Sequence, residues 1–338
     1  MTTPSSETWN RVRWAESSNP CVESLFLKFH LPGNAAFWAR YTLRRPAPGS
    51  GPAVGCLWAV CARPEGTAVA CNTHPESEVD CARTRFWLRI GPGELSTGRA
   101  TGRVERLVSP DGTSIPGDIT WDLTFETGPT LVHLPLPSLY AAPLPRNKIV
   151  SPLVSTRFHG TIRVQGTEFR VVGAPGMQGH NWGAAVSPSW AWCHVAGFHG
   201  EEDAVFEALN SGMQMGPVEV PLTLLYLRLR GREHNQNHPV RMALAKSRVD
   251  GLRWRFEGSV GAVRLDGEVV ARPGDAVGLD YLSSDGCVVR CVNSNLASAR
   301  VRVRGLPGGE RVLATGNTAT LELGGRMAPP GVPSAVRG

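Results

Sequence analysis

Short apolar runs separated by glycine and proline recur along almost the whole of this 338-residue chain. Glycine supplies 38 residues and proline 27, and most of them stand between runs in which apolar and polar residues alternate. Alternation with a period of two is typical of β-strands that bury one face, and turn residues at roughly every 8–12 positions indicate many short strands. The sequence therefore predicts an all-β protein.

The strand pattern continues from end to end, with one break near residue 215. The clearest runs lie at 23–30, 36–43, 54–62, 118–125, 189–198, 221–229 and 299–303. We place a domain boundary at the break, which gives an N-terminal domain of residues 1–214 and a C-terminal domain of residues 215–338. Each half then holds roughly eight to ten strands, the number that closes an antiparallel up-and-down barrel around one small ligand. No strong amphipathic helix pattern occurs, so we do not expect a doubly wound α/β fold with a nucleotide site.

The pattern fails between residues 128 and 152, where six prolines interrupt it. They are Pro129, Pro135, Pro137, Pro143, Pro145 and Pro152. A segment of this length without regular structure is often functional. It is either a loop that covers the mouth of a barrel or an inert crossover around the barrel.

The chain carries 35 basic and 29 acidic residues, a formal net charge of +6. Its arginines mostly alternate with apolar residues along the expected strands, as at Arg300, Arg302 and Arg304. That arrangement is more typical of the solvated face of a sheet than of a track that binds phosphates. We therefore expect no nucleic-acid partner.

The N-terminus lacks the basic and apolar regions of a signal peptide, and no segment offers roughly 18 uninterrupted apolar residues. We therefore expect a cytoplasmic protein without a membrane span, while peripheral membrane contact and the oligomeric state stay open. The 8 cysteines would then remain reduced. Cys287 and Cys291 are expected to be small buried residues, because no second Cys or His pair stands at a zinc-binding spacing.

The densest group of chemically versatile residues lies at 176–194. There, Gly-Met-Gln-Gly-His-Asn-Trp-Gly is followed by Trp-Ala-Trp-Cys-His. Gln178, His180 and Asn181 offer amide and imidazole groups between glycines, which let a backbone approach a ligand closely. We expect a polar loop that binds a ligand. The alternative is that His180 only closes this loop by hydrogen bonding to main chain.

A strand with three large side chains is expected directly after this loop. Trp190, Trp192 and His194 alternate onto one face of it, because side chains in a strand have a period of two. Such a face is rarely left in water. Glu207 is in phase on the following strand, either as an acid that faces the same enclosure or as a solvated carboxylate. A few polar groups among indole rings are typical of a small-molecule site.

Other chemistries have less support in the sequence. No Gly-x-Ser-x-Gly motif occurs, and Cys193 points away from His194 on the expected strand, so nucleophilic catalysis is not indicated. The spacing of His180, His194 and His199 matches no helix-borne zinc pattern, and no helix pattern follows the glycine-rich segments. We therefore expect neither a metal ion nor a cofactor.

The motif resembles the signature of the lipocalin-like AttH and hydroxyneurosporene synthase (carotenoid 1,2-hydratase) family. Tocopherol cyclase and the lipocalin-like Diels–Alderases are wider relatives of that family. The His-Asn-Trp-Gly core carries most of the resemblance, which spans most of residues 8–305. Weaker matches are Glu23-Ser-Leu-Phe-Leu-Lys, Ala36-Phe-Trp-Ala-Arg-Tyr-Thr-Leu, Arg157-Phe-His-Gly-Thr-Ile, Tyr281 and Cys291-Val-Asn-Ser-Asn-Leu.

The resemblance implies two tandem lipocalin-like antiparallel β-barrels. In the carotenoid hydratases an acid protonates an isoprenoid double bond and water captures the cation, which Trp182, Trp190 and Trp192 would stabilise. The acid is implied to be an aspartate directly before the His-Asn-Trp, and that position is Gly179 here. Glu207 or Asp280 would have to replace it. Gly179 in place of the acid favours ring closure and isomerisation over hydration, because these reactions need mainly confinement and a hydrogen-bond donor.

We expect a cofactor-independent enzyme that acts on a large hydrophobic polyene or isoprenoid-like molecule by cyclisation, hydration or isomerisation. His180 and Asn181 are the expected catalytic residues, with His180 as the donor of a proton or hydrogen bond and Asn181 as an orienting group. The expected ligand-binding residues are Gln178, Trp182, Trp190, Trp192, His194 and Glu207. The alternative is a carrier or sensor that binds a hydrophobic ligand without transforming it, since one fold can serve both purposes.

Overall fold

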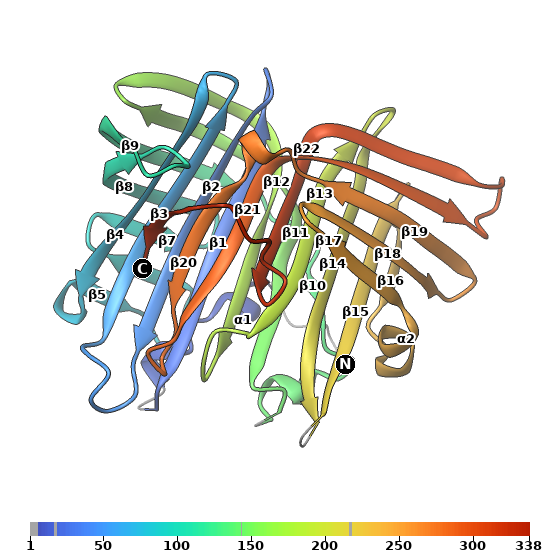
Figure 1. Ribbon diagram of the computed structural model, residues 1–338, viewed down its shortest axis with the longest axis horizontal. Helices are drawn as coiled ribbons and strands as arrows, with labels where there is room; N and C mark the ends of the chain where they lie inside the picture. Colours follow the sequence, from blue (N-terminus) through green and yellow to red (C-terminus); the bar gives the residue numbers. More distant parts are fainter. Residues whose placement is uncertain (1–5, 17–18, 143, 216–217) are drawn as a thin grey trace.

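The computed structural model describes residues 6–16, 19–142, 144–215 and 218–338, and it consists almost entirely of β-strands (Figure 1). The strands form two large sheets, and nearly all neighbouring strands are antiparallel. The predicted all-β fold of two tandem lipocalin-like antiparallel barrels is confirmed: the structure has two antiparallel sheets, and one of them is ring-like. Within the described residues, no helix is long and apolar enough to cross a membrane.

Within the part of the chain that the structure describes, the first sheet has 12 strands and closes into a ring, which we call the first barrel. Its strands are β1 (Cys21–Leu31), β2 (Ala35–Arg45), β3 (Val54–Arg63), β4 (Gly66–Pro75), β5 (Val79–Cys81), β6 (Trp87–Ile90), β7 (Gly93–Ser96), β8 (Arg99–Val108), β9 (Ser114–Phe125), β10 (Leu131–Val132), β11 (Asn147–Val164) and β12 (Thr167–Gly183). The ring runs β11-β12-β1-β2-β3-β4-β8-β9 and returns to β11, because β9 pairs with both β8 and β11. β10 lies beside β11, and β7, β6 and β5 extend the sheet from β8.

Large apolar side chains from alternating strand positions fill the interior of the first barrel. Ile119, Trp121, Leu123 and Phe125 of β9 all belong to this core, as their period of two indicates. The Trp121 Nε1 donates a hydrogen bond to the Tyr41 hydroxyl at 2.8 Å. The polar ends of both rings are therefore satisfied within the core, and the rings themselves occupy the barrel.

Among the described residues, the second sheet has 11 strands in the order β16-β15-β14-β13-β22-β21-β19-β18-β17, with β20 beside β21 and β23 beside β20. They are β13 (Ser189–Phe198), β14 (Glu201–Met215), β15 (Val218–Leu229), β16 (Arg232–Gln236), β17 (Lys246–Asp250), β18 (Arg253–Val260), β19 (Val263–Val270), β20 (Val277–Leu282), β21 (Val288–Arg304), β22 (Arg311–Gly325) and β23 (Ser334–Arg337). The α-helices are α1 (Ser6–Asn10) and α2 (Pro239–Leu244), and the 3-10 turns are η1 (Trp14–Glu16), η2 (Glu76–Glu78), η3 (Pro137–Tyr140) and η4 (Pro273–Asp275). Helix α2 connects β16 to β17, the two ends of this strand order, and packs on β15 and β18.

The chain passes from the first sheet to the second at residues 184–188, between β12 and β13. β13 and β14 therefore belong to the second sheet, and the boundary predicted near residue 215 does not coincide with this crossing. β14 and β15 pair as far as Met215 and Val218, so the break in the pattern lies within a hairpin. A hairpin and a linker give the same local signal of glycine and proline. Gly216 and Pro217 lie outside the described residues.

The second sheet covers the outer face of β1, β2 and β3 (Figure 1). Phe26, Trp38 and Trp58 of the first barrel form one buried core with Trp192 and Leu279 of the second sheet. β1, β2 and β3 are consequently buried on both faces over most of their length. Polar side chains on the outer face of these strands cannot be hydrated, so they must find partners between the two sheets.

Candidate functional site

The His-Asn-Trp-Gly motif lies within β12, and the predicted polar loop is wrong. β12 pairs with β1 so that His180 is opposite Leu25 and Gln178 is opposite Leu27. Residues directly opposite each other project to the same face, so His180 and Gln178 point into the first barrel and Asn181 points to the outer face. The loop was predicted because glycine often marks a turn. In β12 the motif's glycines instead allow neighbouring groups to pack closely against the strand.

His180 is fully buried and both of its ring nitrogens have partners. Nδ1 lies 2.7 Å from the main-chain oxygen of Trp9, and Nε2 lies 2.8 Å from Oε1 of Glu23. The same carboxylate accepts hydrogen bonds from the main-chain nitrogens of Arg13 at 2.8 Å and Trp14 at 2.5 Å. Both ring nitrogens therefore lie within hydrogen-bonding distance of an oxygen that can accept.

Gln178 and Trp182 belong to the same arrangement inside the first barrel. The Gln178 Oε1 accepts a hydrogen bond from Asn10 Nδ2 at 3.1 Å, and the Trp182 ring packs on His180 with centres 4.7 Å apart. We call Asn10, Glu23, Gln178, His180 and Trp182 the His180 cluster. Its hydrogen bonds anchor α1 and the segment after it to the barrel. The observed contact of His180 with the main chain of Trp9 agrees with the alternative interpretation, in which His180 bonds to main chain.

Gly179 stands where the resemblance implies an aspartate. A Cβ atom at this position would lie 2.2 Å from Cζ of Phe26, so no larger residue fits without displacing that ring. Phe26 in turn packs edge-on against Trp192, with ring centres 5.6 Å apart. An aromatic ring therefore occupies the space beside Gly179 between the two sheets.

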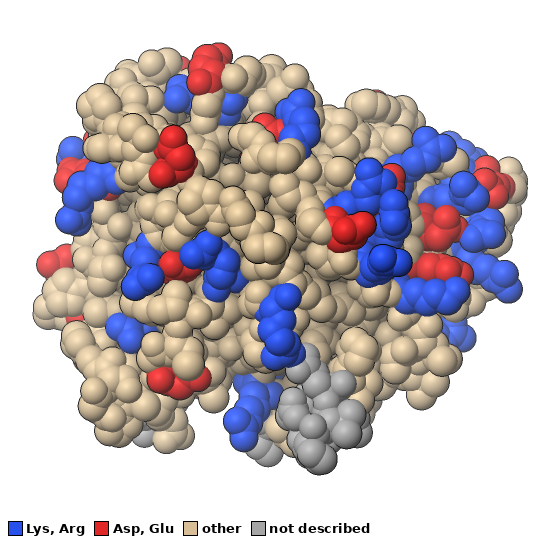
Figure 2. All heavy atoms as spheres, viewed as in Figure 1, with Lys and Arg blue, Asp and Glu red and all other residues tan. Residues whose placement is uncertain are grey.

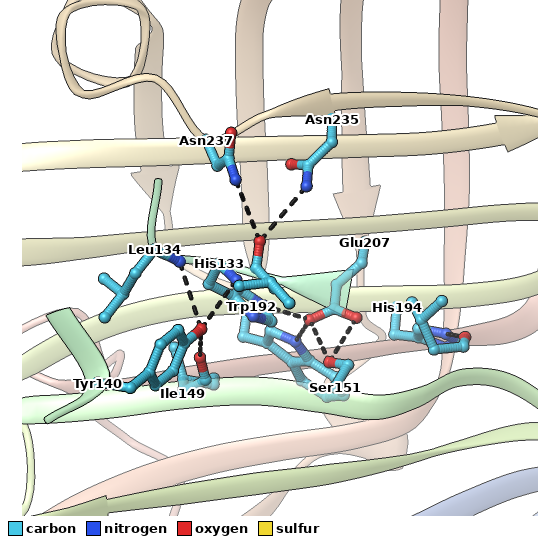
Figure 3. Close-up of polar contacts among 12 residues, drawn as sticks. His133, Leu134, Tyr140, Ile149, Ser151, Trp192, His194, Glu207, Asn235 and Asn237 are labelled. Carbon is cyan, nitrogen blue, oxygen red and sulfur yellow. Dashed lines mark hydrogen bonds and ion pairs between the residues drawn. The ribbon is translucent and has the colours of Figure 1, made fainter. Parts of the chain in front are cut away.

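A second buried polar cluster lies between the two sheets. Glu207 of β14 is opposite His194 of β13 and is fully buried. Its Oε1 accepts hydrogen bonds from His133 Nε2 at 2.9 Å and Trp192 Nε1 at 3.1 Å, and its Oε2 accepts one from Ser151 Oγ at 2.9 Å (Figure 3). Of the two interpretations of Glu207, the solvated carboxylate is therefore wrong.

Lys28, on the outer face of β1, is also fully buried between the sheets. Its Nζ donates to the main-chain oxygen of His194 at 3.2 Å, and no carboxylate among the described residues lies within 4.0 Å of it. Burial lowers the pKa of Lys28 to about 7, an effect that the negative charge of Glu207 opposes only in part. A lysine with this pKa gains and loses a proton at neutral pH.

Three histidines near this lysine each use one ring nitrogen. His30 Nε2 lies 2.7 Å from the main-chain oxygen of Asn295, and His194 Nε2 lies 2.8 Å from that of Val154. Nδ1 of both rings, and of His133, has no hydrogen-bond partner among the described residues. Burial lowers the pKa of His30 to about 3 and that of His194 well below its usual value. Both rings are therefore neutral, with a free acceptor lone pair at Nδ1.

Glu322 and Arg40 extend the polar region along the same interface. Glu322 of β22 is opposite Trp192 on one side and Asn293 on the other, and Asn293 Nδ2 donates to its Oε1 at 2.8 Å. Burial raises the pKa of Glu322, although the positive charge of Arg40 opposes the rise. The Arg40 guanidinium lies 4.0 Å from the centre of the Tyr281 ring. We define the interface cluster as Lys28, His30, Arg40, His133, Ser151, Trp192, His194, Glu207 and Glu322.

Asp280, the other acid considered as a replacement, is held in its charged form. Arg290 and Arg337 pair with its two carboxylate oxygens at 2.5 and 3.3 Å. Burial alone would raise the pKa of Asp280, but hydrogen bonds from Arg290 and Ser334 outweigh burial and the pKa is lowered. A carboxylate stabilised in this way is a poor proton donor.

The proline-rich segment 128–152 covers both clusters. Tyr140, in η3, packs against Trp9 and Trp182 with ring centres 4.7 and 5.7 Å away. His133, in the same segment, reaches Glu207 between the sheets. Of the two expectations for this segment, covering is the one that the geometry supports. Pro143 lies outside the described residues.

Hydrogen bonds hold this segment at both of its sides (Figure 3). The Tyr140 hydroxyl donates to the main-chain oxygen of Ile149 at 2.8 Å and accepts from the His133 nitrogen at 3.1 Å. The main-chain oxygen of Val132 accepts hydrogen bonds at 3.3 Å from the side chains of Asn235, in β16 of the second sheet, and Asn237, directly after β16. The segment therefore bridges the first barrel and the second sheet.

The structure thus separates residues that the sequence analysis had grouped. His180 and Gln178 lie inside the first barrel, whereas Trp192 and His194 lie between the sheets. Asn181 is half-buried on the outer face of β12. Trp190 stacks on Tyr281, with ring centres 6.2 Å apart and the rings nearly parallel.

Sequence reasoning missed Glu23 and most of the interface cluster. Lys28 and His30 alternate with apolar residues along β1, which is the pattern of a strand with one solvated face. One signal was available: Trp38 and Trp58 occupy outward positions of the neighbouring strands, and their rings are buried. Large indoles at outward positions indicate that the outer face of a barrel is covered.

Residues 146–325, more than half of the chain, match the model of a family described as tocopherol cyclase-like. Among curated proteins, none matches this sequence. The match includes the His-Asn-Trp-Gly motif, β13, β14 and most of the second sheet. The family resemblance inferred from the motif is therefore confirmed.

Several solved structures are similar over nearly the full length of the chain. CghA, also solved with Sch210972, is 16% identical with a TM-score of 0.58, and the match covers 98% of this chain and 94% of that one. Kievitone hydratase from Nectria haematococca is 11% identical with a TM-score of 0.56, and 96% and 92% are covered. A protein assigned as AttH (NE1406) from Nitrosomonas europaea is 11% identical with a TM-score of 0.54, and 89% and 91% are covered. At these identities the likeness concerns the fold, and it confirms the lipocalin-like architecture.

Proposed function

Because this chain belongs to the tocopherol cyclase-like family, we propose that it is a cofactor-independent enzyme acting on a hydrophobic polyene or isoprenoid-like molecule. The ligand binds between the two sheets, at the interface cluster, and undergoes ring closure or isomerisation assisted by proton transfer. One observation carries the proposal: Lys28 is fully buried there, and no carboxylate among the described residues lies within 4.0 Å of it.

A purely structural role accounts poorly for Lys28. Taking an ammonium group out of water costs several kcal/mol unless an opposite charge and further hydrogen bonds compensate. A methionine would fill similar volume without that cost. Ionisable residues with strongly shifted pKa values in such surroundings are concentrated at functional sites.

Lys28 serves as the proton carrier in this proposal. Near neutral pH its ammonium form donates to an oxygen of the ligand more readily than an ordinary lysine does, because its pKa is about 7. After the new bond has formed, the amine takes back a proton from another atom of the ligand. Ring closure and isomerisation consume no net proton, so no co-reactant is required.

The surrounding residues bind and orient the ligand. Trp192 and Phe26, which pack edge-on against each other, form an aromatic wall that stabilises positive charge on a polyene. Glu207 holds the rings of Trp192 and His133 in place through its hydrogen bonds. The free Nδ1 of His194 accepts a hydrogen bond from a ligand hydroxyl.

His180 and Gln178 are positioning residues in this proposal. Their hydrogen bonds go to Trp9 and Asn10, so they hold the N-terminal segment on the barrel. Asn181 lies on the outer face of β12, the side that faces the second sheet, and it contacts the ligand there.

A carrier function is favoured by one observation. The space beside Gly179, where the resemblance implies the acid of the hydratases, is occupied by the ring of Phe26. A carrier binds the ligand without changing it. It therefore does not need a proton donor in the interface cluster.

The variant Lys28→Met separates the two functions. If the chain is an enzyme, turnover of a polyene or prenylated phenol falls by at least about a hundredfold, the usual contribution of a positioned acid, while native mass spectrometry still detects the bound ligand. Wild-type activity declines as the pH rises above about 7, because the ammonium form is lost, and this limb is absent from the variant. Lys246→Met, at an exposed lysine of the second sheet, is the matched control. An unmodified, tightly held ligand in the wild type and no effect of Lys28→Met would establish the carrier instead.

A further inference from the structure

The outer face of the second sheet is strongly basic along β17, β18, β19 and the end of β21. The inner positions of these strands, such as Trp254, Leu265 and Val301, lie in the core, so the alternate positions face outward. Two shallow adjoining grooves of about 210 and 400 Å³ run over this surface and share Lys246 and Glu257. Figure 2 shows lysines and arginines gathered at this end of the molecule, on the right, where Figure 1 places β17 to β19.

Most of the chain's net charge is concentrated on this surface, which we call the basic face. Its basic residues are Arg241, Lys246, Arg248, Arg255, Arg264, Arg300, Arg302 and Arg304. Its acidic residues are Glu257, Asp266 and Glu268. Eight basic against three acidic side chains leave +5 here, in a chain whose formal net charge is +6.

Several arginines of the basic face form no ion pair, although one of them, Arg300, stands directly opposite Glu268 on β19. Within the described part of the chain, Arg248, Arg264 and Arg300 are exposed and form no ion pair within 4.0 Å. Arg248 is directly opposite Arg255 on the neighbouring strand, and like charges in that position destabilise a sheet. Repulsion between arginines destabilises the sheet and is not needed for solubility. We infer that the excess positive charge is available to bind an anionic partner.

Exposed apolar side chains stand among these arginines. Val240 and Leu244 lie four residues apart on α2 and are 60% and 75% exposed. Leu244 lines the smaller groove together with Arg264. Val312, 43% exposed, is opposite Arg302 on the neighbouring strand. Nucleic acid needs no such groups, whereas apolar side chains ringed by basic residues suit the boundary between lipid head groups and acyl chains.

We propose that the basic face docks the protein on an anionic membrane surface. Lipid phosphate and carboxylate groups bind Arg248, Arg264 and Arg300, and Val240 and Leu244 enter the interfacial layer. The charge of the face is complementary to such a surface, and each basic residue near it strengthens binding about fivefold. The proposal does not depend on the reaction at the interface cluster.

Co-sedimentation with lipid vesicles tests this docking. We expect binding to phosphatidylcholine vesicles that contain about 30% phosphatidylserine, little binding to pure phosphatidylcholine, and loss of binding as salt is added. The triple variant Arg248→Gln/Arg264→Gln/Arg300→Gln binds the anionic vesicles about a hundredfold more weakly. Leu244→Ser weakens binding severalfold at unchanged charge.

The control is a triple variant at exposed arginines of the first barrel, Arg83→Gln/Arg106→Gln/Arg170→Gln, with thermal unfolding to show that each protein is folded. Binding that is absent from both vesicle types, or that falls equally in the control, overturns the proposal. The same holds if Leu244→Ser has no effect. Binding to polyuridine RNA without binding to vesicles also overturns it, in favour of a nucleic-acid surface.

Discussion

The two buried polar clusters lie on opposite faces of β1, and they differ in how fully their ionisable side chains are paired. In the His180 cluster, both ring nitrogens of His180 and both oxygens of Glu23 have partners, whereas the amide atoms Asn10 Oδ1 and Gln178 Nε2 have none among the described residues. In the interface cluster, among the described residues, Lys28 has no carboxylate partner and the histidines each keep one nitrogen unbonded. Fully paired ionisable groups stabilise a fold, whereas buried ionisable groups without such partners are typical of sites where a ligand binds.

His180→Ala is expected to have the largest effect on stability. Removing the imidazole leaves the buried carboxylate of Glu23 without its side-chain partner, which lowers the free energy of unfolding by about 3–5 kcal/mol. Urea denaturation measures the loss. Asn181→Ala, one residue away on the opposite face, is the control and changes stability by less than about 1 kcal/mol. A His180→Ala protein with wild-type stability and no turnover would contradict this prediction. It would show that His180 acts in catalysis rather than in stabilising the fold.

Lys28→Met is expected to raise the free energy of unfolding, by less than His180→Ala lowers it. Burial lowers the pKa of Lys28 from 10.5 to about 7, so between these pH values the unfolded chain binds one proton more than the folded chain. Wild-type stability therefore rises with pH over this interval. The variant is more stable than the wild type by about 2–4 kcal/mol at pH 7, and the difference shrinks toward pH 10.

Chemical denaturation at several pH values, with Lys246→Met as control, measures this difference. A Lys28→Met protein that is less stable than the wild type at pH 7 would mean that the lysine holds the two sheets together. The distinction between the two clusters would then disappear.

Gly179→Ala tests the comparison on β12, the strand that pairs with β1, and its effect is the smallest of the three. The new Cβ would lie 2.2 Å from the Phe26 ring, and overpacking of this kind costs about 1–3 kcal/mol. Phe26→Leu in the same protein relieves the clash and recovers part of the loss, which a double-mutant cycle measures. A Gly179→Ala protein as stable as the wild type would show that Phe26 yields easily and leaves room for an acid.

Much of the molecule follows from local sequence pattern. The period of two correctly placed Trp192 and His194 on one face of a strand, with Glu207 beside them on the next. The motif correctly indicated the family. The pattern failed at Gly179, because glycine occurs both in loops and at close contacts within strands. It predicted a loop, whereas Gly179 lies in a strand and allows close packing there.

Local sequence predicted most of the strands and the side chains that share a strand face, because both depend on neighbours only a few residues away. Which of those faces are buried depends on tertiary packing. Lys28 and His194 stand 166 positions apart, and no local pattern brings them together. Docking of the second sheet on β1 removes water from a face that alternation alone would assign to solvent, and this desolvation lowers the pKa of Lys28.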